Sequence, residues 1–513
     1  MSPVIAWNGS TGTVGRTALR YFLRRWDDES PVGTAQAVSL ELRLTGRSTE
    51  RLEAVAAEVS AAYPQHRVRV CAGCDAEQDP ADWPGAPLTG VDLLVNTAGP
   101  GYVVTPRLAR YCLTHNMAYA DPSGDHSMVD EIVATSDLPA TYPHAGQASV
   151  PVGETPTVPA GQPADVPAVT VPVILGAGIQ PGLSGILVRL LARAAGPGAT
   201  VELYSGGAQP TTEAAVHEFV DSVNSGMLWA GKEWIDGQLR SSRLPESYLA
   251  QVAATFSPTA VAHAHCDREV AAAAAAAQAH SVRWHNVSDA PKTTLEIQKM
   301  IAGDATVEQV MEAARMDDFG RRHYFRMEGT AVSAGLSDAP LREFHTPLGE
   351  SMVDTMNSSD PVNRADPAEM WHATLECVDS FLVTASVTAI AALYALRRAC
   401  PSVGAAQPSL NSGVGGCPAT DRNTAGAPDP VSPHGAGTPT TSVTAAGMGA
   451  SSATDSSASL VTPTTPVVPA GVCLPVNLPD TDYWWEDIMK DPATVTTSLR
   501  QGDTALDDEE GEL

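Results

Sequence analysis

Short apolar runs alternate with stretches of helical periodicity from residue 1 to about residue 135. The runs begin at Val4, Leu40, His66 and Val91, and a shorter run covers Ala118–Ala120. Strands that alternate with helices pair in parallel, and the helices cover both faces of the sheet. The pattern therefore predicts an N-terminal α/β domain with a doubly wound parallel sheet.

Composition divides the rest of the chain into patterned and low-complexity parts. Proline, alanine, glycine and threonine dominate residues 139–168 and 404–472, which lack the apolar side chains to bury a core. A strand-like run at Val169–Gly178 opens a second patterned region. We expect a first domain at 1–138, a flexible insertion at 139–168, a second domain at 169–403, a disordered linker at 404–472 and an acidic tail at 473–513.

One apolar run resembles a membrane span. Phe381–Leu396 carries no charge and is bounded by Asp379 and Arg397. A span needs about 20 apolar residues, and this run is shorter and rich in alanine, threonine and serine. We therefore expect a buried helix and no membrane, and a membrane-associated protein stays the alternative.

Charge and cysteine content limit the classes of partner and compartment. The net charge of −28 argues against nucleic-acid binding, which requires a basic surface. The eight cysteines form no dense framework, and no basic segment precedes the first apolar run. Both features favour free thiols and a cytoplasmic location.

A glycine-rich turn separates the first strand from the first helix. Gly9, Gly12 and Gly15 are spaced three residues apart between them. Glycines let the backbone approach a pyrophosphate, and the free N–H groups of the helix then donate to it. The turn predicts a dinucleotide site made by Gly9, Ser10, Thr11, Gly12, Thr13, Val14 and Gly15. A glycine turn with no ligand is the competing interpretation.

The ends of the following strands indicate which dinucleotide binds. An acidic residue that binds the ribose of NAD usually follows the second strand, but here Gly46, Arg47 and Ser48 follow it. A guanidinium and a hydroxyl suit a 2′-phosphate, which predicts NADP (NADPH). The competing interpretation is that Ser48 only caps the following helix and that Arg47 is solvated. Further candidates are Asp75 near the adenine, and Ala98, Gly99 and Pro100 beside the nicotinamide.

Candidates for catalysis follow the short strand at Ala118–Ala120. Asp121, Asp125 and His126 lie on the rim where ligands of such sheets bind, and each could donate a proton or hold a substrate. Capping of the next helix is an equally good interpretation of the carboxylates. A substrate carboxylate would need arginine, for which Arg240, Arg243, Arg321 and Arg322 are available.

Several other motifs fail on a required residue. No lysine has a tyrosine four positions before it, which excludes the short-chain dehydrogenase mechanism. Gly226–Lys232 resembles a P-loop, but Glu233 stands where serine or threonine must hold magnesium. Neither Cys71–Cys74 nor His263–Cys266 has the partners of a metal site, so we predict no metal.

Four stretches together resemble the saccharopine dehydrogenase family, in its NADP-binding reductase-like branch. They are NGSTGTVGR, TGRSTERL, VNTAGPGYVVTPRLARYC with NMAYADPSGD, and ILGAGIQPGLSGILVRLLA, and they cover residues 1 to about 235. The resemblance implies a Rossmann-like domain followed by a second α/β (α+β) domain, with a mostly antiparallel sheet, for substrate binding and dimerisation. It also implies an oxidoreductase that transfers hydride between NADP and a C–N bond of an imine-type or opine-type small molecule.

Two other functions remain open. A non-catalytic NADP-binding scaffold or sensor fits the lack of an obvious proton donor, and a membrane-associated enoyl-type reductase fits the apolar run. The aromatic patch Tyr483–Trp485 lies between acidic residues after the expected linker. Such a patch could dock on a protein partner or back on the same chain, and a disordered tail is the competing interpretation.

Overall fold

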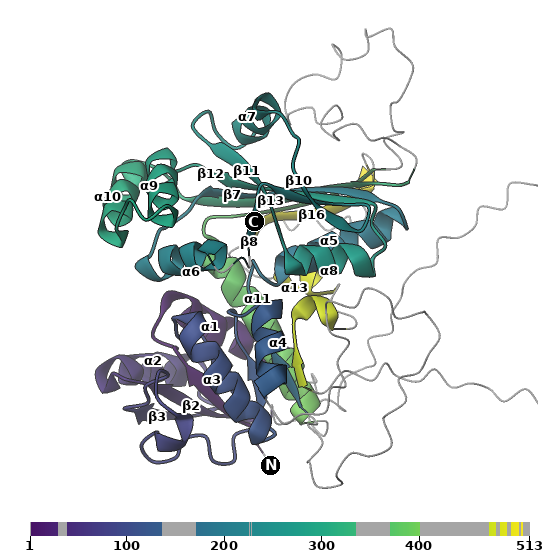
Figure 1. The fold of residues 1–513 in the computed structure, drawn as a ribbon. Helices are drawn as coiled ribbons and strands as arrows, with labels where there is room; N and C mark the ends of the chain where they lie inside the picture. Colours follow the sequence, from purple (N-terminus) through teal and green to yellow (C-terminus); the bar gives the residue numbers. More distant parts are fainter. Residues whose placement is uncertain are drawn as a thin grey trace, which may run out of the picture. The chain divides into compact units, whose positions relative to one another are not determined.

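The computed structural model describes residues 2–28, 38–135, 171–334 apart from 225 and 227, 370–400, 471–478, 483–489, 494–501 and 504–505. The predicted insertion at 139–168 and nearly all of the predicted linker at 404–472 lie outside these residues. The described part contains two sheets with helices, which confirms the α/β class (Figure 1).

The first sheet has seven strands, all parallel, in the order β15-β6-β5-β4-β1-β2-β3. Its strands are β1 (Val4–Asn8), β2 (Glu41–Gly46), β3 (Arg67–Ala72), β4 (Leu93–Asn96), β5 (Ala118–Ala120), β6 (Pro172–Ile174) and β15 (Gly471–Cys473). The connecting helices are α1 (Thr13–Asp28), α2 (Thr49–Ala62), α3 (Gly101–Thr114) and α4 (His126–Thr135), with the 3₁₀ turn η1 (Pro80–Asp82). The predicted doubly wound parallel sheet is therefore present.

The first sheet also takes up segments that the sequence pattern assigned elsewhere. Pro172–Ile174 was expected to open the second domain, but β6 pairs with β5. Gly471–Cys473, at the end of the expected linker, pairs with β6. A parallel sheet grows by adding strands that need not be neighbours in the sequence, so composition alone does not reveal which sheet a strand joins.

The second sheet has ten strands and is mostly antiparallel, with one parallel pair, β7 and β12. Its strands are β7 (Thr200–Ala208), β8 (Leu228–Ala230), β9 (Lys232–Ile235), β10 (Gln238–Ser241), β11 (Val261–Asp267), β12 (Ser281–Ser288), β13 (Tyr324–Val332), β14 (Met370–Cys377), β16 (Thr494–Gln501) and β17 (Thr504–Ala505). The mostly antiparallel sheet that the resemblance implied is therefore present.

Helices cover both faces of the second sheet (Figure 1). The helices of this region are α5 (Leu183–Ala195), α6 (Glu213–Asn224), α7 (Glu246–Ala254), α8 (Arg268–Ala276), α9 (Pro291–Ile301) and α10 (Val307–Asp318). Of these, α9 and α10 pack on each other and on α6. Helix α5 packs on β7, β13 and β14, and α7 packs on β11. At Gly329 of β13 an added Cβ would lie 2.4 Å from Leu191 of α5, so the absence of a side chain allows this close packing.

The apolar run forms α11 (Ser380–Ala399), which is long and apolar enough to cross a membrane. In the structure, 72% of its apolar window is buried. The helix packs against α1 and against β4, β5 and β6 of the first sheet. The Thr388 hydroxyl donates to the carbonyl of Ala177 at 2.9 Å. Burial against the sheet thus accounts for the composition of α11, as the expected buried helix requires.

The aromatic patch belongs to α13 (Tyr483–Met489), which follows the 3₁₀ turn η5 (Pro475–Asn477). The side chains of Trp484 and Trp485 are 0% and 1% exposed and join the main apolar core. Of the two predicted docking modes, these tryptophans therefore use the one within the same chain.

Candidate functional site

The glycine turn joins β1 to α1 in the geometry expected of a phosphate-binding turn. Gly9 has a φ of +83°, and its carbonyl accepts a hydrogen bond from the Gly12 N–H at 3.0 Å. An added Cβ at Gly9 would lie 2.6 Å from the Ala98 nitrogen, and one at Gly15 would lie 2.2 Å from the Gly9 carbonyl oxygen. These two glycines are therefore required by the packing of the turn itself.

Gly12 differs from the other two glycines. An added Cβ there would meet only the Gly9 carbonyl oxygen, at 3.5 Å, and its φ lies outside the left-handed region. Gly12 is exposed, as are Thr11 and Thr13 beside it, at the N-terminus of α1. Neither packing nor backbone conformation explains the glycine here, whereas a pyrophosphate that must approach the backbone would explain it.

The register of the sheet gathers the other predicted cofactor residues at the same edge. Asn8 at the end of β1 is opposite Thr45 of β2 and Asn96 of β4, and Gly46 is opposite Ala72 of β3. Because the strands are parallel, the residues that follow them share the carboxyl edge of the sheet. These residues are Arg47, Ser48, Asp75, Ala98, Gly99 and Pro100.

The two residues chosen for a 2′-phosphate differ in their surroundings. Arg47 is exposed and makes no hydrogen bond or ion pair with the residues that the structure describes. Ser48 is the N-cap of α2 and its hydroxyl accepts from the Arg51 N–H at 3.4 Å, as its alternative interpretation predicted. Asp75 accepts from the Glu77 N–H at 3.2 Å with its side chain and from the Trp83 indole at 2.9 Å with its carbonyl.

Asp121, directly after β5, is buried and accepts several hydrogen bonds. Its carboxylate accepts hydrogen bonds from Tyr119 (2.5 Å), Thr105 (2.8 Å), Asn96 (2.8 Å) and the Ser123 N–H (2.8 Å), and the side chain is 1% exposed. Burial raises its pKa to about 6, against the lowering effect of these donors. With four donors and an almost fully buried side chain, Asp121 holds the loop after β5 in place.

The other two catalytic candidates lie at the start of α4. Asp125 accepts from the Met128 N–H at 3.0 Å, which agrees with the capping interpretation, and burial raises its pKa. His126 is 2% exposed, and neither ring nitrogen makes a hydrogen bond with a described residue. Burial lowers the pKa of His126 to about 4, so its ring is neutral at pH 7.

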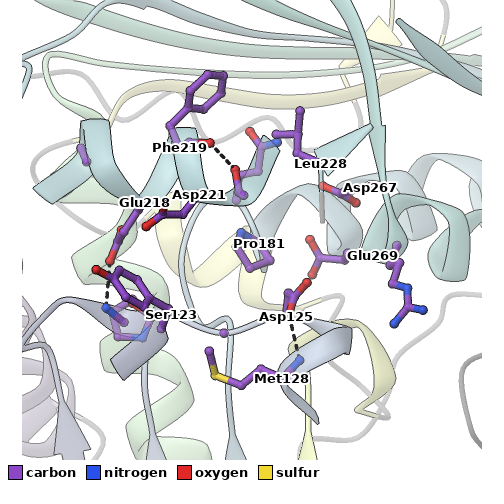
Figure 2. A pocket seen from close by; sticks show the side chains of 18 of the residues that line it. Ser123, Asp125, Met128, Pro181, Glu218, Phe219, Asp221, Leu228, Asp267 and Glu269 are labelled. Carbon is purple, nitrogen blue, oxygen red and sulfur yellow. Dashed lines mark hydrogen bonds between the residues drawn. The ribbon is translucent and has the colours of Figure 1, made fainter. Parts of the chain in front are cut away.

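A pocket of about 330 Å³ opens beside these loops (Figure 2). One wall comes from the first sheet, through the start of α3 and the loop after β5. The opposite wall comes from α6 and from the junction of β11 and α8. The loop before α5 also contributes to the lining. The residues that line the pocket include Gly101, Ser123, Asp125, Gln180, Pro181, Glu218, Asp221, Asp267, Arg268 and Glu269.

Carboxylates dominate the charge of the pocket. Five of the lining side chains are acidic: Asp125, Glu218, Asp221, Asp267 and Glu269. Arg268 is the single cation among the lining residues, and its guanidinium also contacts the Asp130 carboxylate at 3.1 Å. The pocket therefore favours a ligand that carries positive charge.

Burial weakens the acidity of these carboxyl groups. It raises the pKa of Glu218, and it raises that of Asp267 to about 6 and that of Glu269 to about 8. Glu269 accepts from the Gly182 N–H at 2.8 Å and from the Ser184 hydroxyl at 2.7 Å. Glu218 accepts from the Gly101 N–H at 3.2 Å and so connects α6 to the start of α3.

Sequence reasoning missed the wall made by α6 and α8. Glu218 and Asp221 lie in an ordinary amphipathic helix, and only the fold turns them toward the loop after β5 (Figure 2). For Asp267 the sequence offers a signal, because aspartate is a preferred N-cap and α8 begins directly after it. In the structure its carboxylate accepts a hydrogen bond from the Val270 N–H at 2.8 Å. Of the arginines proposed for a substrate carboxylate (Arg240, Arg243, Arg321 and Arg322), none is among the lining residues.

The cysteine and histidine motifs form no cluster of metal ligands among the described residues. No group of three His, Cys, Asp or Glu side chains in the described ranges could hold a metal ion. Cys71 and Cys74 are buried free thiols, and the Cys74 sulfur lies 3.2 Å from the Cys71 carbonyl oxygen. Burial raises the pKa of both, to about 11 for Cys74, which keeps them protonated at pH 7.

No protein-family model matches the chain, and no curated protein matches it significantly. The comparison with solved structures gives matches at low identity and low TM-score. The WlbA (WbpB) dehydrogenase from Thermus thermophilus, in complex with NAD and UDP-GlcNAcA, is 12% identical over 61% of this chain and 93% of its own, with a TM-score of 0.26.

Two further structures have similar scores. Aspartate semialdehyde dehydrogenase II from Vibrio cholerae is 10% identical over 78% of this chain and 99% of its own (TM-score 0.29). GenD2 from gentamicin A biosynthesis, in complex with NAD, is 9% identical over 79% and 94% (TM-score 0.28). Similarity at this level carries no argument about function and does not confirm the saccharopine dehydrogenase family.

Proposed function

We propose that the chain is an NADP-dependent oxidoreductase that reduces a protonated C=N bond in a small molecule. The observation that carries this proposal is the arrangement at the carboxyl edge of the first sheet. A glycine turn with open space at Gly12 lies at that edge, and an acid-lined pocket opens at the loop after β5. A dinucleotide and a cationic substrate would thus meet at one edge of one sheet.

Each phosphate group of NADP would have its own partners at this edge. The open face of Gly12 and the first N–H groups of α1 would hold the pyrophosphate. Arg47, exposed at the end of β2, would bind the 2′-phosphate that distinguishes NADP from NAD. Gly99 and Pro100 would lie beside the nicotinamide, next to Gly101 at the rim of the pocket.

The acidic pocket accounts for the lack of an obvious proton donor. Bound NADPH would supply a hydride, and a protonated imine that accepts it at carbon becomes an amine as the C=N electron pair moves to nitrogen, so no donor is needed. Carboxylates stabilise the positive charge of the imine before transfer. Asp125, Glu218 and Asp221 would hold this cation, whereas Asp121 and His126 are buried.

The first test is a titration of the full-length protein with NADPH and NADH, followed by fluorescence. The second is NADPH oxidation with three classes of compound: a cyclic imine that is protonated at neutral pH, an imine that carries a carboxylate, and an uncharged enoyl compound. We expect NADPH to bind more tightly than NADH and the cationic imine to be turned over fastest.

A matched pair of variants tests the pocket. Asp125→Asn removes the charge and keeps a cap for α4, because asparagine caps as well as aspartate. Asp79 caps the distant turn η1 by accepting from the Ala81 N–H at 2.9 Å, so Asp79→Asn is the control. We expect only Asp125→Asn to raise KM for the cationic imine.

The titration and the turnover assay also separate the alternative functions. NADPH binding without turnover of any compound would favour the scaffold or sensor, and a failure to bind NADPH would refute the cofactor assignment.

A further inference from the structure

The segment that follows residue 470 contributes a strand to each of the two sheets. β15 pairs in parallel with β6, with Val472 opposite Val173. β16 pairs antiparallel with β14, with Ser498 opposite Thr374. Between these strands η5 contacts α5 and α8, and α13 contacts α5 and α11. The segment therefore completes both sheets although residues 401–470 separate it from α11.

Buried side chains anchor this segment to the rest of the fold. Trp484, Trp485 and Ile488 of α13 are at most 1% exposed. The ring of Trp484 meets Tyr394 of α11 edge-to-face, with ring centres 5.9 Å apart. Figure 1 shows α13 in yellow beside α11, in agreement with these contacts. Large aromatic side chains buried in this way dominate the energetics of an interface.

Two buried arginines donate hydrogen bonds to the main chain of the segment. Arg189 of α5, 3% exposed, donates to the carbonyls of Val476 (2.6 Å) and Leu478 (3.2 Å). Arg25 of α1, 6% exposed, donates to the carbonyl of Asp487 at 2.8 Å. A buried guanidinium must be hydrogen-bonded, so departure of the segment would take acceptors from both charges.

The segment also touches the loop that lines the pocket. The Cys473 carbonyl accepts from the Leu175 N–H at 3.0 Å. An added Cβ at Gly176 would lie 3.1 Å from a methyl group of Leu474. The Gly176 N–H in turn donates to the carbonyl of Ser123 at 2.9 Å, and Ser123 lines the pocket. Four residues after Gly176, the same loop contributes Gln180 to the lining.

We propose that the described residues 471–478, 483–489 and 494–501 form a brace. A brace here means a segment that is held by non-covalent contacts, that stays bound when the chain is cut within 401–470, and that positions the pocket loop Leu175–Pro181. The contacts of the tryptophans and arginines provide the binding, and those of Cys473 and Leu474 provide the positioning. The proposal goes beyond the enzymatic function and does not depend on it, because its tests measure fragment association and hydrogen exchange.

The first experiment cuts the full-length protein at one place. A recognition sequence for a site-specific protease is inserted between residues 434 and 435, and the purified protein is cleaved. We expect the two fragments to elute together in size-exclusion chromatography at micromolar concentration and to separate only in denaturant. Separation of the fragments in native buffer would overturn the brace.

The second experiment tests the positioning of the loop in the uncut chain. Leu474→Ala removes the side chain that meets Gly176, and Phe319→Ala is the control because Phe319 is 90% exposed. We expect Leu474→Ala to speed hydrogen exchange of the amides of residues 175–177 by about tenfold or more, and Phe319→Ala to leave it unchanged. Unchanged exchange in Leu474→Ala would refute the positioning role. If that variant does not fold, the cut protein of native sequence still tests the brace.

Discussion

Replacing Gly12 and Gly15 separately by alanine distinguishes a ligand-binding turn from a merely structural one. At Gly12 the added methyl group meets only the Gly9 carbonyl oxygen, at 3.5 Å, which is ordinary van der Waals contact. At Gly15 it would lie 2.2 Å from that oxygen and 2.3 Å from the Thr97 hydroxyl oxygen. The same change in chemistry is therefore harmless to packing at one position and disruptive at the other.

The magnitudes follow from these distances. Gly12→Ala should change the free energy of unfolding by less than about 1 kcal/mol, and in the stabilising direction, because alanine restricts the unfolded chain. Gly15→Ala should destabilise the fold by about 1–3 kcal/mol through overpacking. For the ligand, loss of one hydrogen bond to a charged phosphate costs about 1.5–3 kcal/mol, so Gly12→Ala should weaken NADPH binding by about 10- to 150-fold.

Two measurements on each variant distinguish a ligand-binding turn from a structural one. They are urea denaturation followed by circular dichroism, and NADPH titration followed by fluorescence. We expect Gly12→Ala to be as stable as the native protein and to bind NADPH poorly. Native NADPH affinity in Gly12→Ala would refute the argument that a pyrophosphate occupies this space. A loss of stability in Gly12→Ala comparable to that in Gly15→Ala would show that Gly12 is a packing residue.

Three further predictions concern the cofactor, the pocket and the core. Arg47→Ala should weaken NADPH binding by about tenfold or more and leave NADH binding unchanged, with Arg51→Ala as the control; equal losses for both cofactors would contradict the 2′-phosphate assignment. Burial raises the pKa of Glu269 from 4.5 to about 8, so its contribution to stability is complete below pH 4.5 and is lost as the pH rises through 8. Glu269→Gln should therefore gain stability relative to the native protein between about pH 5 and pH 8.5 in denaturant titrations, and a constant difference would contradict the raised pKa. Trp484→Ala should cost about 3–5 kcal/mol and Phe319→Ala less than about 0.5 kcal/mol, measured by urea denaturation; equal effects would show that Trp484 is not in the core.

The parts of the site that the sequence predicted are those made by local structure. The glycine turn, the cap at Ser48 and the residues after each strand need only a strand and a helix that are adjacent in the sequence. The parallel register then brings Arg47 and Ala98 to the edge that holds Gly12, because the residues after parallel strands share one edge. Local pattern and sheet geometry together thus suffice to bring these residues to one edge, and the binding of a cofactor there stays a prediction.

The opposite wall of the pocket could not be predicted in this way. Glu218 is 117 residues from Gly101, whose N–H it accepts, and no periodicity relates the two. An amphipathic helix shows which face is apolar, but it does not show what its polar face meets. Glu218 and Asp221 look like ordinary surface acids in the sequence, and their charge matters only because the fold places them at one pocket with Asp125.

From the sequence alone, the apolar helix α11 and the aromatic patch Tyr483–Trp485 each allow more than one interpretation. The contact between them in the structure accounts for the composition of both. α11 is buried around nearly its whole circumference from Val383 to Leu396, so it needs apolar partners on every side. The first sheet and α1 cover part of it, and α13 brings Trp484 against Tyr394. A membrane would supply such an environment without α13, whereas a core of this protein requires it. The tryptophans among the acids near the C-terminus are therefore the counterpart of the uncharged helix, and the two must be interpreted together.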